Sequence, residues 1–359
     1  MRFDRRLCRT VIAVSMLAIL TLSGCNLSPE AKEASFLEKG RKEVAKQNYA
    51  AAILYFKNAS AAKPWDAEPY YRLGLAYLAG GDFKSAAAEI LKAVEVNPRH
   101  TGAQLRLAEM MATSRDKKDL EAAQKHAQAV LALLPDDPDA LNVLGVTDLR
   151  LGKPESAQPY LEQALRKTPT HLNSWVVLSQ VKLARNDVAG AEKALLEAYT
   201  RLPKSPAPGI YLGEFYLAQG RAPEAEREFR KALVMDPRQG TALMDLAAMQ
   251  VKAGQTDQAE QTYRQAAALP DKQYRPVHAE FLFRSGKRDL AVAEFEKLVA
   301  ANPEDSELRE KLVEAYLTLN RPGDAERVLT AAIRKNGLDQ DALMRRSRIY
   351  LNAGKYTQA

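Results

Sequence analysis

The sequence predicts an all-α protein built as a stack of antiparallel helix pairs, because one register of about 34 residues recurs along it. Repeats begin at residues 33, 67, 101, 138, 172, 206, 240, 272, 306 and 340. Position 20 is alanine in every repeat: Ala52, Ala86, Ala123, Ala157, Ala191, Ala225, Ala259, Ala291, Ala325 and Ala359. Glycine or asparagine at position 15 and proline at position 32 recur in the same register. An alanine-rich composition does not explain ten matches in one register.

The first helix of a pair is illustrated by the repeat at residues 67–100. Tyr70, Leu73 and Tyr77 fall at positions 4, 7 and 11, a spacing that places them on one face of a helix. Gly81, at position 15, tolerates the left-handed backbone conformation in which many helices end. We therefore expect a helix that ends before position 15 and is followed by a tight turn.

The second helix of the same repeat carries Ala86, Ile90 and Ala93 at positions 20, 24 and 27, again on one face. Pro98, at position 32, stops it, because proline lacks an amide hydrogen and clashes with the preceding turn. The alanine at position 20 allows the two helices to cross closely, where a larger side chain would hold them apart. The side chain at position 24 then fills the gap between them.

This pattern resembles the tetratricopeptide repeat, whose signature is W-x2-L-G-x2-Y, then A-x3-F, then P. The resemblance implies a right-handed α-solenoid of antiparallel helix pairs over residues 33–359, with the first helices lining a concave groove. The predicted solenoid contains about ten repeats. The tenth is incomplete, since it stops at Ala359 without the polar capping helix that normally closes a solenoid.

In this family, positions 2, 5, 9, 12 and 13 of the first helices face the groove. Carried over, they predict a protein-binding groove formed by Tyr71, Leu75, Leu105, Glu109, Asn142, Val146, Val176, Gln180, Ile210 and Glu214. The pattern continues into later repeats through Glu280, Phe283 and Glu314. Such a groove has an apolar floor with acidic spots and suits an extended or helical peptide. For any single residue, the alternative is a purely structural role in helix packing.

Several repeats depart from the pattern, and two of these departures predict a local change in structure. The third is three residues longer near Arg115 to Asp119, which predicts a bulged turn between its helices. The eighth carries Pro276 where its first helix should begin, which predicts a disturbed first helix and a regular second one.

The first 32 residues indicate export and membrane attachment. Residues 1–24 have a basic start and an apolar run of 12 residues from Val11 to Leu22, which is too short to span a bilayer and fits a secretory signal peptide. The segment from Leu22 to Cys25 resembles the bacterial lipobox, which implies lipid attachment at Cys25 and a short tether over residues 25–32. Asn26 is not the aspartate that retains some enterobacterial lipoproteins in the inner membrane, so outer-membrane sorting, facing the periplasm, is favoured.

Charge and residue usage exclude several functions. The net charge is +7, of which the signal peptide carries +3, and no basic stripe of the kind that binds nucleic acid is present. Cys8 and Cys25 both precede the repeats, so neither a disulfide framework nor a cysteine-based zinc site is expected in them. The four histidines lack ligand spacing, and catalytic motifs are absent. We expect no metal, cofactor, small-molecule substrate or nucleic acid, and no catalysis.

The sequence therefore predicts a lipid-anchored scaffold of the bacterial cell envelope that binds other envelope proteins or peptides. Export, polysaccharide secretion, protein sorting and pilus assembly are the processes that such a scaffold would serve. One alternative is the N-terminal repeat region of a larger enzyme, such as a glycosyltransferase or peptidase, with its catalytic domain beyond residue 359. A purely structural spacer is a third reading.

Overall fold

A computed structural model describes residues 28–354 of the chain, which contain nineteen α-helices, one short 3-10 helix and no strand. The first helices of the repeats are α2 (Pro29–Ala45), α4 (Ala67–Ala79), α6 (Thr101–Ala112), α8 (Pro138–Arg150), α10 (Leu172–Ala184), α12 (Ala207–Ala218), α14 (Gly240–Lys252), α16 (Val277–Arg284), α18 (Ser306–Thr318) and α20 (Gln340–Asn352). The second helices are α3 (Tyr49–Ala62), α5 (Phe83–Val96), α7 (Lys117–Leu131), α9 (Pro154–Lys167), α11 (Val188–Arg201), α13 (Ala222–Met235), α15 (Thr256–Ala267), α17 (Arg288–Ala301) and α19 (Pro322–Lys335). The 3-10 helix η1 (Lys272–Tyr274) precedes α16.

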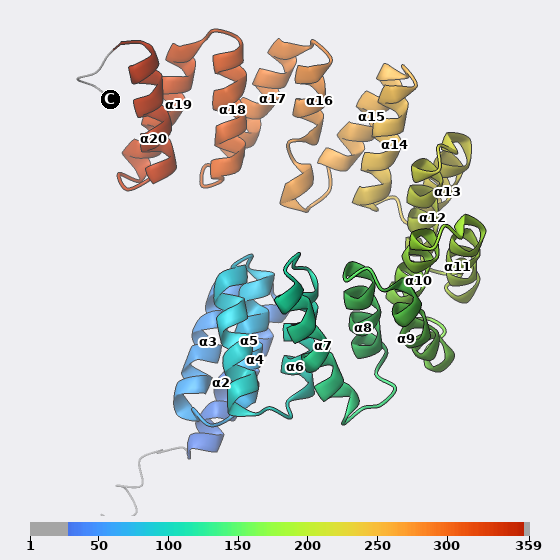
Figure 1. The fold of residues 1–359 in the computed structure, drawn as a ribbon. Coiled ribbons are helices and arrows are strands. Elements are labelled where there is room, and N and C mark those ends of the chain that lie inside the picture. The colour runs from blue at the N-terminus through green and yellow to red at the C-terminus, as the bar shows by residue number, and fades with distance from the viewer. Residues whose placement is uncertain (1–27, 355–359) are drawn as a thin grey trace, which may run out of the picture. The chain divides into compact units, whose positions relative to one another are not determined.

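The helices group into two compact units, which divide between Ala194 and Leu195 within α11. In each unit, helices that follow one another in sequence pack side by side, joined by short turns (Figure 1). Both units are therefore α-solenoids of antiparallel helix pairs, which confirms the predicted fold class.

The alanines at position 20 lie where the two helices of a pair cross. Nine of the ten fall within the described residues, and every one of them has 0 % of its surface exposed: Ala52, Ala86, Ala123, Ala157, Ala191, Ala225, Ala259, Ala291 and Ala325. A longer side chain has no free volume to enter at these points, since protein interiors are close-packed. The register read from the sequence is thus the packing register of the fold.

Glycine at position 8 lets the side chain at position 24 sit directly on the first helix. A methyl group added at Gly145 or Gly213 would lie 2.6 Å from Leu161 or Phe229, respectively. Both of these larger side chains are completely buried. Each fills the space that the glycine leaves open and so completes the contact between the helices of a pair.

The turn between the two helices of a pair has one recurring conformation. Position 15 has a φ between 56° and 87° in nine of the ten repeats, at Gln47, Gly81, Gly152, Asn186, Gly220, Gly254, Gly286, Asn320 and Gly354. The amide of the next residue donates to the carbonyl of position 11, as from Arg321 to Tyr316 at 2.8 Å, which is the Schellman pattern of a helix end. The glycine and asparagine signal is confirmed; Gln47 adopts the conformation without it.

The extra residues of the third repeat fall mostly outside the turn between its helices. The connection after α7, residues 132–137, is two residues longer than most of its counterparts, and α7 itself has 15 residues against 14 in most second helices. α7 begins at Lys117, six residues before Ala123, whereas the other second helices begin three residues before their alanines. The connection over residues 113–116 is only one residue longer than its counterparts. Asp116 caps α7 by accepting a hydrogen bond of 2.7 Å from the amide of Lys118. The predicted bulge is therefore wrong, because Asp116 starts the helix a turn early.

The eighth repeat is disturbed at the predicted place. α16 has only 8 residues and begins directly after Pro276, while α17 is regular with 14. The displaced segment forms η1, which places the ring of Tyr274 against Gly240, where a methyl group would clash with it. The prediction from Pro276 is confirmed.

At the N-terminal end, α2 begins at Pro29, capped by the hydroxyl of Ser28, which accepts from the amide of Ala31 at 3.2 Å. Residues 29–32, expected within the tether, are thus helical. The predicted signal peptide (residues 1–24) and Cys25 lie outside the described residues, as does Ala359. Over residues 28–354, no helix combines the length and the apolar character needed to cross a bilayer.

Candidate protein-binding surface

The structure places the ten predicted groove residues on first helices. Eight belong to the N-terminal unit, on α4, α6, α8 and α10, namely Tyr71, Leu75, Leu105, Glu109, Asn142, Val146, Val176 and Gln180. Ile210 and Glu214 lie on α12 in the C-terminal unit. Gln180 is exposed, Ile210 is 7 % exposed, and the others are half-buried. We call the surface that the first helices form within one unit its first-helix face.

In the N-terminal unit, several of these residues are engaged in packing. The ring centroids of Tyr71 and His100 are 4.9 Å apart, and a methyl group at Gly102 would lie 3.1 Å from the Tyr71 ring. Leu105 and Val146 pack against the buried cluster between α6, α7 and α8. These three side chains therefore help to join one repeat to the next, whatever else they contact.

Glu109 and Asn142 are polar groups set into this face. An Arg106 guanidinium nitrogen lies 2.6 Å from a Glu109 carboxylate oxygen. Burial nevertheless raises the pKa of Glu109, because the loss of hydration outweighs the attraction of Arg106. The side-chain nitrogen of Asn142 is buried without a hydrogen-bond partner among the described residues.

Two histidines link successive repeats of the N-terminal unit. His100 and His171 both occupy position 34, and their Nε2 atoms lie 3.1 Å from a Glu68 carboxylate oxygen and 3.0 Å from an Asp139 carboxylate oxygen, respectively. His100, followed by Arg72, lowers the pKa of Glu68 to about 2. Each histidine directly precedes the first helix of the next repeat, so its bond ties that helix's start to the first helix of its own repeat.

The C-terminal unit carries a pair of carboxylates at the start of its first-helix face. Glu214 on α12 and Asp245 on α14 are half-buried, and burial raises the pKa of each, with repulsion from Asp245 adding to that of Glu214. One Asp245 carboxylate oxygen is buried without a hydrogen-bond partner. Within residues 28–354, no lysine or arginine forms an ion pair with either group. Negative charge is therefore left uncompensated at this point.

A cavity of about 240 Å³ opens further along the same face, between α16 and α18. Phe283, Phe295 and Ala315 form its apolar walls. Charged groups surround it, and the Lys311 ammonium lies 2.6 Å from a Glu280 carboxylate oxygen. The Glu280 side chain raises the pKa of Lys311, so this lysine is held as a cation.

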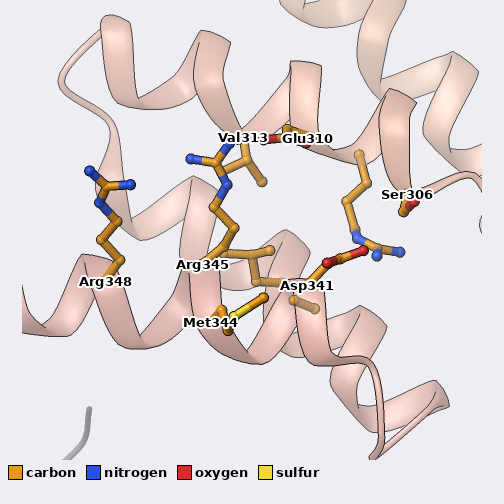
Figure 2. A pocket seen from close by; sticks show the side chains of 10 residues that line it. Ser306, Glu310, Val313, Asp341, Met344, Arg345 and Arg348 are labelled. Atoms are coloured by element: carbon orange, nitrogen blue, oxygen red, sulfur yellow. Dashed lines mark ion pairs between the residues drawn. The ribbon is translucent and has the colours of Figure 1, made fainter. Parts of the chain in front are cut away.

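A second cavity, of about 280 Å³, lies between α18 and α20. Figure 2 shows Arg345 and Arg348 on α20, both directed toward the helix that carries Glu310 and Val313. Arg345 forms an ion pair with Glu310, whereas Arg348 has no ion-pair partner among the described residues. Arg309, at the inner wall, is 6 % exposed and pairs with Asp339 at 2.8 Å.

The groove positions predicted from the sequence include only some of the residues that line these two cavities. Glu280, Phe283 and Glu314 belong to the predicted pattern at positions 9 and 12, and all three line the first cavity. Lys311 and Arg345 occupy position 6 of consecutive repeats, a position that the family pattern does not assign to the groove. Their recurrence as basic residues was the available signal.

No group of three or more histidine, cysteine, aspartate or glutamate side chains in residues 28–354 is arranged to hold a metal ion. His278, which is 6 % exposed, bonds through Nδ1 to a Glu294 carboxylate oxygen at 2.8 Å, a contact between the two helices of its own repeat.

Comparisons with known proteins agree with this architecture. Models of the tetratricopeptide repeat match residues 43–107, 114–171, 144–206, 216–280 and 282–344. No curated protein sequence matches the chain. A tetratricopeptide repeat protein from Parabacteroides merdae, of known structure, is 13 % identical with a TM-score of 0.54, over 70 % of this chain and 99 % of its own.

Two further solved structures are similar. Pseudomonas aeruginosa pilF is 14 % identical with a TM-score of 0.47, over 62 % of this chain and 100 % of its own. The human IFIT1 dimer with m7Gppp-AAAA is 17 % identical with a TM-score of 0.47, over 89 % of this chain and 78 % of its own. At such identities a structural likeness concerns the fold alone. Because the family models cover most of its length, the chain belongs to the tetratricopeptide repeat family.

Proposed function

We propose that this chain is a scaffold of the bacterial cell envelope that holds partner proteins or peptides on its first-helix faces. Tetratricopeptide repeats imply a protein–protein interaction scaffold. The observation that carries the proposal is the pair of cavities along α16, α18 and α20. Concave sites with apolar walls and a few charged groups are the usual form of binding sites in proteins.

The binding surface is tested by capture of partners from detergent extracts of the native membrane, with cross-linking and mass spectrometry. Phe283→Glu places a charge in the apolar wall of the first cavity, and Lys311→Glu is a second variant with less effect on the core. The matched control is Leu290→Glu on α17, a second helix, where the side chain is 61 % exposed. We expect both cavity variants to lose partners that the wild type and the control retain. Equal capture by all four proteins would refute the proposal.

The anchor is supported by the sequence around Cys25, with its basic start, short apolar run and lipobox-like segment. Two acyl chains hold a protein durably at a membrane, whereas one gives only reversible binding. Incorporation of radiolabelled palmitate tests this attachment. We expect labelling of the wild type and of Cys8→Ala, but not of Cys25→Ala. Label retained by Cys25→Ala would exclude the anchor.

The proposed location is the outer membrane, with the repeats facing the periplasm. Asn26 supports it, since aspartate at this place retains some lipoproteins of enterobacteria in the inner membrane. Membrane fractionation in an enterobacterial host compares the wild type with Asn26→Asp. We expect the wild type in the outer-membrane fraction and the variant in the inner one; an identical distribution would contradict this sorting.

The proposal assigns no catalytic step to residues 1–359. His100 and His171 support it, because both lie at junctions between repeats, and the Ser174 hydroxyl 2.8 Å from His171 Nδ1 is 0 % exposed and thus out of reach of a substrate. Replacing both with glutamine tests this reading in a strain that depends on the protein. We expect partner capture and growth to persist together; growth lost while capture and fold are intact would indicate chemistry at these residues.

A further inference from the structure

We infer that the first-helix face of the C-terminal unit takes an extended peptide of defined charge order, with a basic residue over α12 and α14, an apolar residue between α16 and α18, and an acidic residue over α20. This inference rests on the proposed function and names the chemistry of its partner. Three separate features of one face carry it: an uncompensated acidic pair, an apolar cavity and an unpaired arginine.

The acidic end is the Glu214–Asp245 pair. Two half-buried carboxylates repel each other, and the described residues supply no cation to offset this. One Asp245 oxygen also lacks a hydrogen-bond donor. A lysine or arginine side chain of a partner supplies the positive charge that this pair lacks, and a hydrogen bond between such a cation and a carboxylate is stronger than one between neutral groups.

The middle of the peptide is recognised by the cavity between α16 and α18. Its volume of about 240 Å³ admits a side chain of the size of leucine or phenylalanine. Phe283 and Phe295 supply apolar contact, while Lys311 is held against Glu280 at the rim. Because Lys311 and Glu280 pair with each other, neither group needs a polar partner from the bound peptide, and an apolar side chain is favoured in this cavity.

The basic end is formed by α20. Arg348 is exposed and has no ion-pair partner in the described part of the chain, and Arg345 lies one turn away on the same face (Figure 2). Asp341 and Glu310 also line this cavity, and Glu310 is occupied by Arg345. The guanidinium of Arg348 is thus the group available to a carboxylate of the partner, which it binds in bidentate geometry.

The spacing of the three contacts follows from the stacking of the helices. A helix with its side chains is about 10 Å wide, so successive first helices of a stack are offset by about that distance, which separates the acidic pair from the first cavity by about 20 Å and the two cavities by about 10 Å. An extended chain advances about 3.3 Å per residue. The partner therefore has an apolar residue about six positions from its basic residue and an acidic residue about three positions further on.

The test uses the full chain purified in detergent and a fluorescent ten-residue peptide. The peptide carries lysine at its first position, phenylalanine at its seventh and aspartate at its tenth, with glycine and serine between. A second peptide exchanges the lysine and the aspartate, so that neither chain direction reproduces the charge order at this spacing. Affinity is measured by fluorescence anisotropy for the wild type, for Glu214→Gln/Asp245→Asn and for Arg348→Gln. Matched controls are Asp289→Asn and Arg334→Gln, which change exposed charges on the second helices α17 and α19.

We expect peptide and protein substitutions to be coupled by location. Exchanging the peptide's lysine for alanine should weaken binding to the wild type about tenfold. The same exchange should weaken binding to Glu214→Gln/Asp245→Asn only slightly, because this variant already lacks the charges that the lysine contacts. Exchanging the peptide's aspartate for alanine should likewise weaken binding to the wild type but hardly affect binding to Arg348→Gln. Both control variants should bind as the wild type does.

Equal losses in all proteins, no binding of the designed peptide, or equally tight binding of the second peptide would overturn this charge order. Circular dichroism of each variant confirms that it folds. If Phe283→Glu still abolishes partner capture while the peptides fail, only the inference fails. If Phe283→Glu and Lys311→Glu leave capture unchanged, the proposed function fails as well.

Discussion

Gly213 offers a direct measure of how tightly the two helices of a repeat are packed. Gly213→Ala places a methyl carbon 2.6 Å from a carbon of the Phe229 ring, about 0.8 Å short of an ordinary contact. The ring is completely buried and has no free space into which to retreat. Such overpacking costs about 1–3 kcal/mol, while alanine within a helix gains about 1 kcal/mol over glycine. We therefore expect a net loss of about 1 kcal/mol in the free energy of unfolding.

The matched control is Gly323→Ala on α19, where an added methyl group meets nothing within 4 Å. This substitution should stabilise the protein by about 0.5–1 kcal/mol. In a Phe229→Leu background, Gly213→Ala should lose its penalty, which gives a coupling energy of about 2 kcal/mol.

Urea unfolding followed by circular dichroism at 222 nm measures these changes. Hydrogen exchange of α12 and α13 locates them, since repeat arrays do not always unfold in one step. Gly213→Ala as stable as Gly323→Ala, or a coupling energy near zero, would refute the close contact between positions 8 and 24.

Three further predictions concern charges and turns. The pKa of Glu68 is lowered to about 2, so the ionised carboxylate stabilises the folded protein by about 2 kcal/mol after allowance for its partial exposure. This stabilisation is present above pH 4.5 and is lost as the pH falls toward 2. Glu68→Gln should therefore make the urea midpoint independent of this loss between pH 2 and 6. The pKa of Asp245 is raised, so the folded protein loses stability as the pH rises through that pKa; Asp245→Asn should be more stable than the wild type at pH 7 but not at pH 3, and an equal gain at both would contradict the assignment. Gly152 has a φ of 73°, so Gly152→Ala should lower the free energy of unfolding by about 1–2 kcal/mol, whereas Asn186→Gly, at a φ of 59°, should not lower it.

The fold could be predicted because its determinants are local and repeated. The alanine at position 20 and the glycine or asparagine at position 15 each act within one helix pair, so the sequence shows them directly. Gln47 was missed because a residue that is not glycine or asparagine adopts the left-handed conformation there at a modest cost, which no sequence pattern records. The third repeat was misread because a capping aspartate, Asp116, competes with turn formation and only the structure decides between them.

The binding surface could be predicted only as a set of helix positions. Tyr71 is at a groove position yet packs on His100, and Ile210 is almost entirely buried. Conversely, Lys311 and Arg345 border cavities from a position not assigned to the groove. Whether a position opens into a cavity depends on the sizes of side chains on two neighbouring repeats, which a register within one repeat does not contain.

The neighbour-to-neighbour packing of the helices has a consequence for how the chain acquires its structure. Within each unit, substantial contacts join helices that are adjacent or next to adjacent in sequence. These contacts therefore close loops of a few tens of residues, so little chain entropy is lost before they form. Proteins with such local contacts fold quickly. A growing polypeptide can thus consolidate pair by pair from its amino end, exposing only one unfinished apolar edge at any moment.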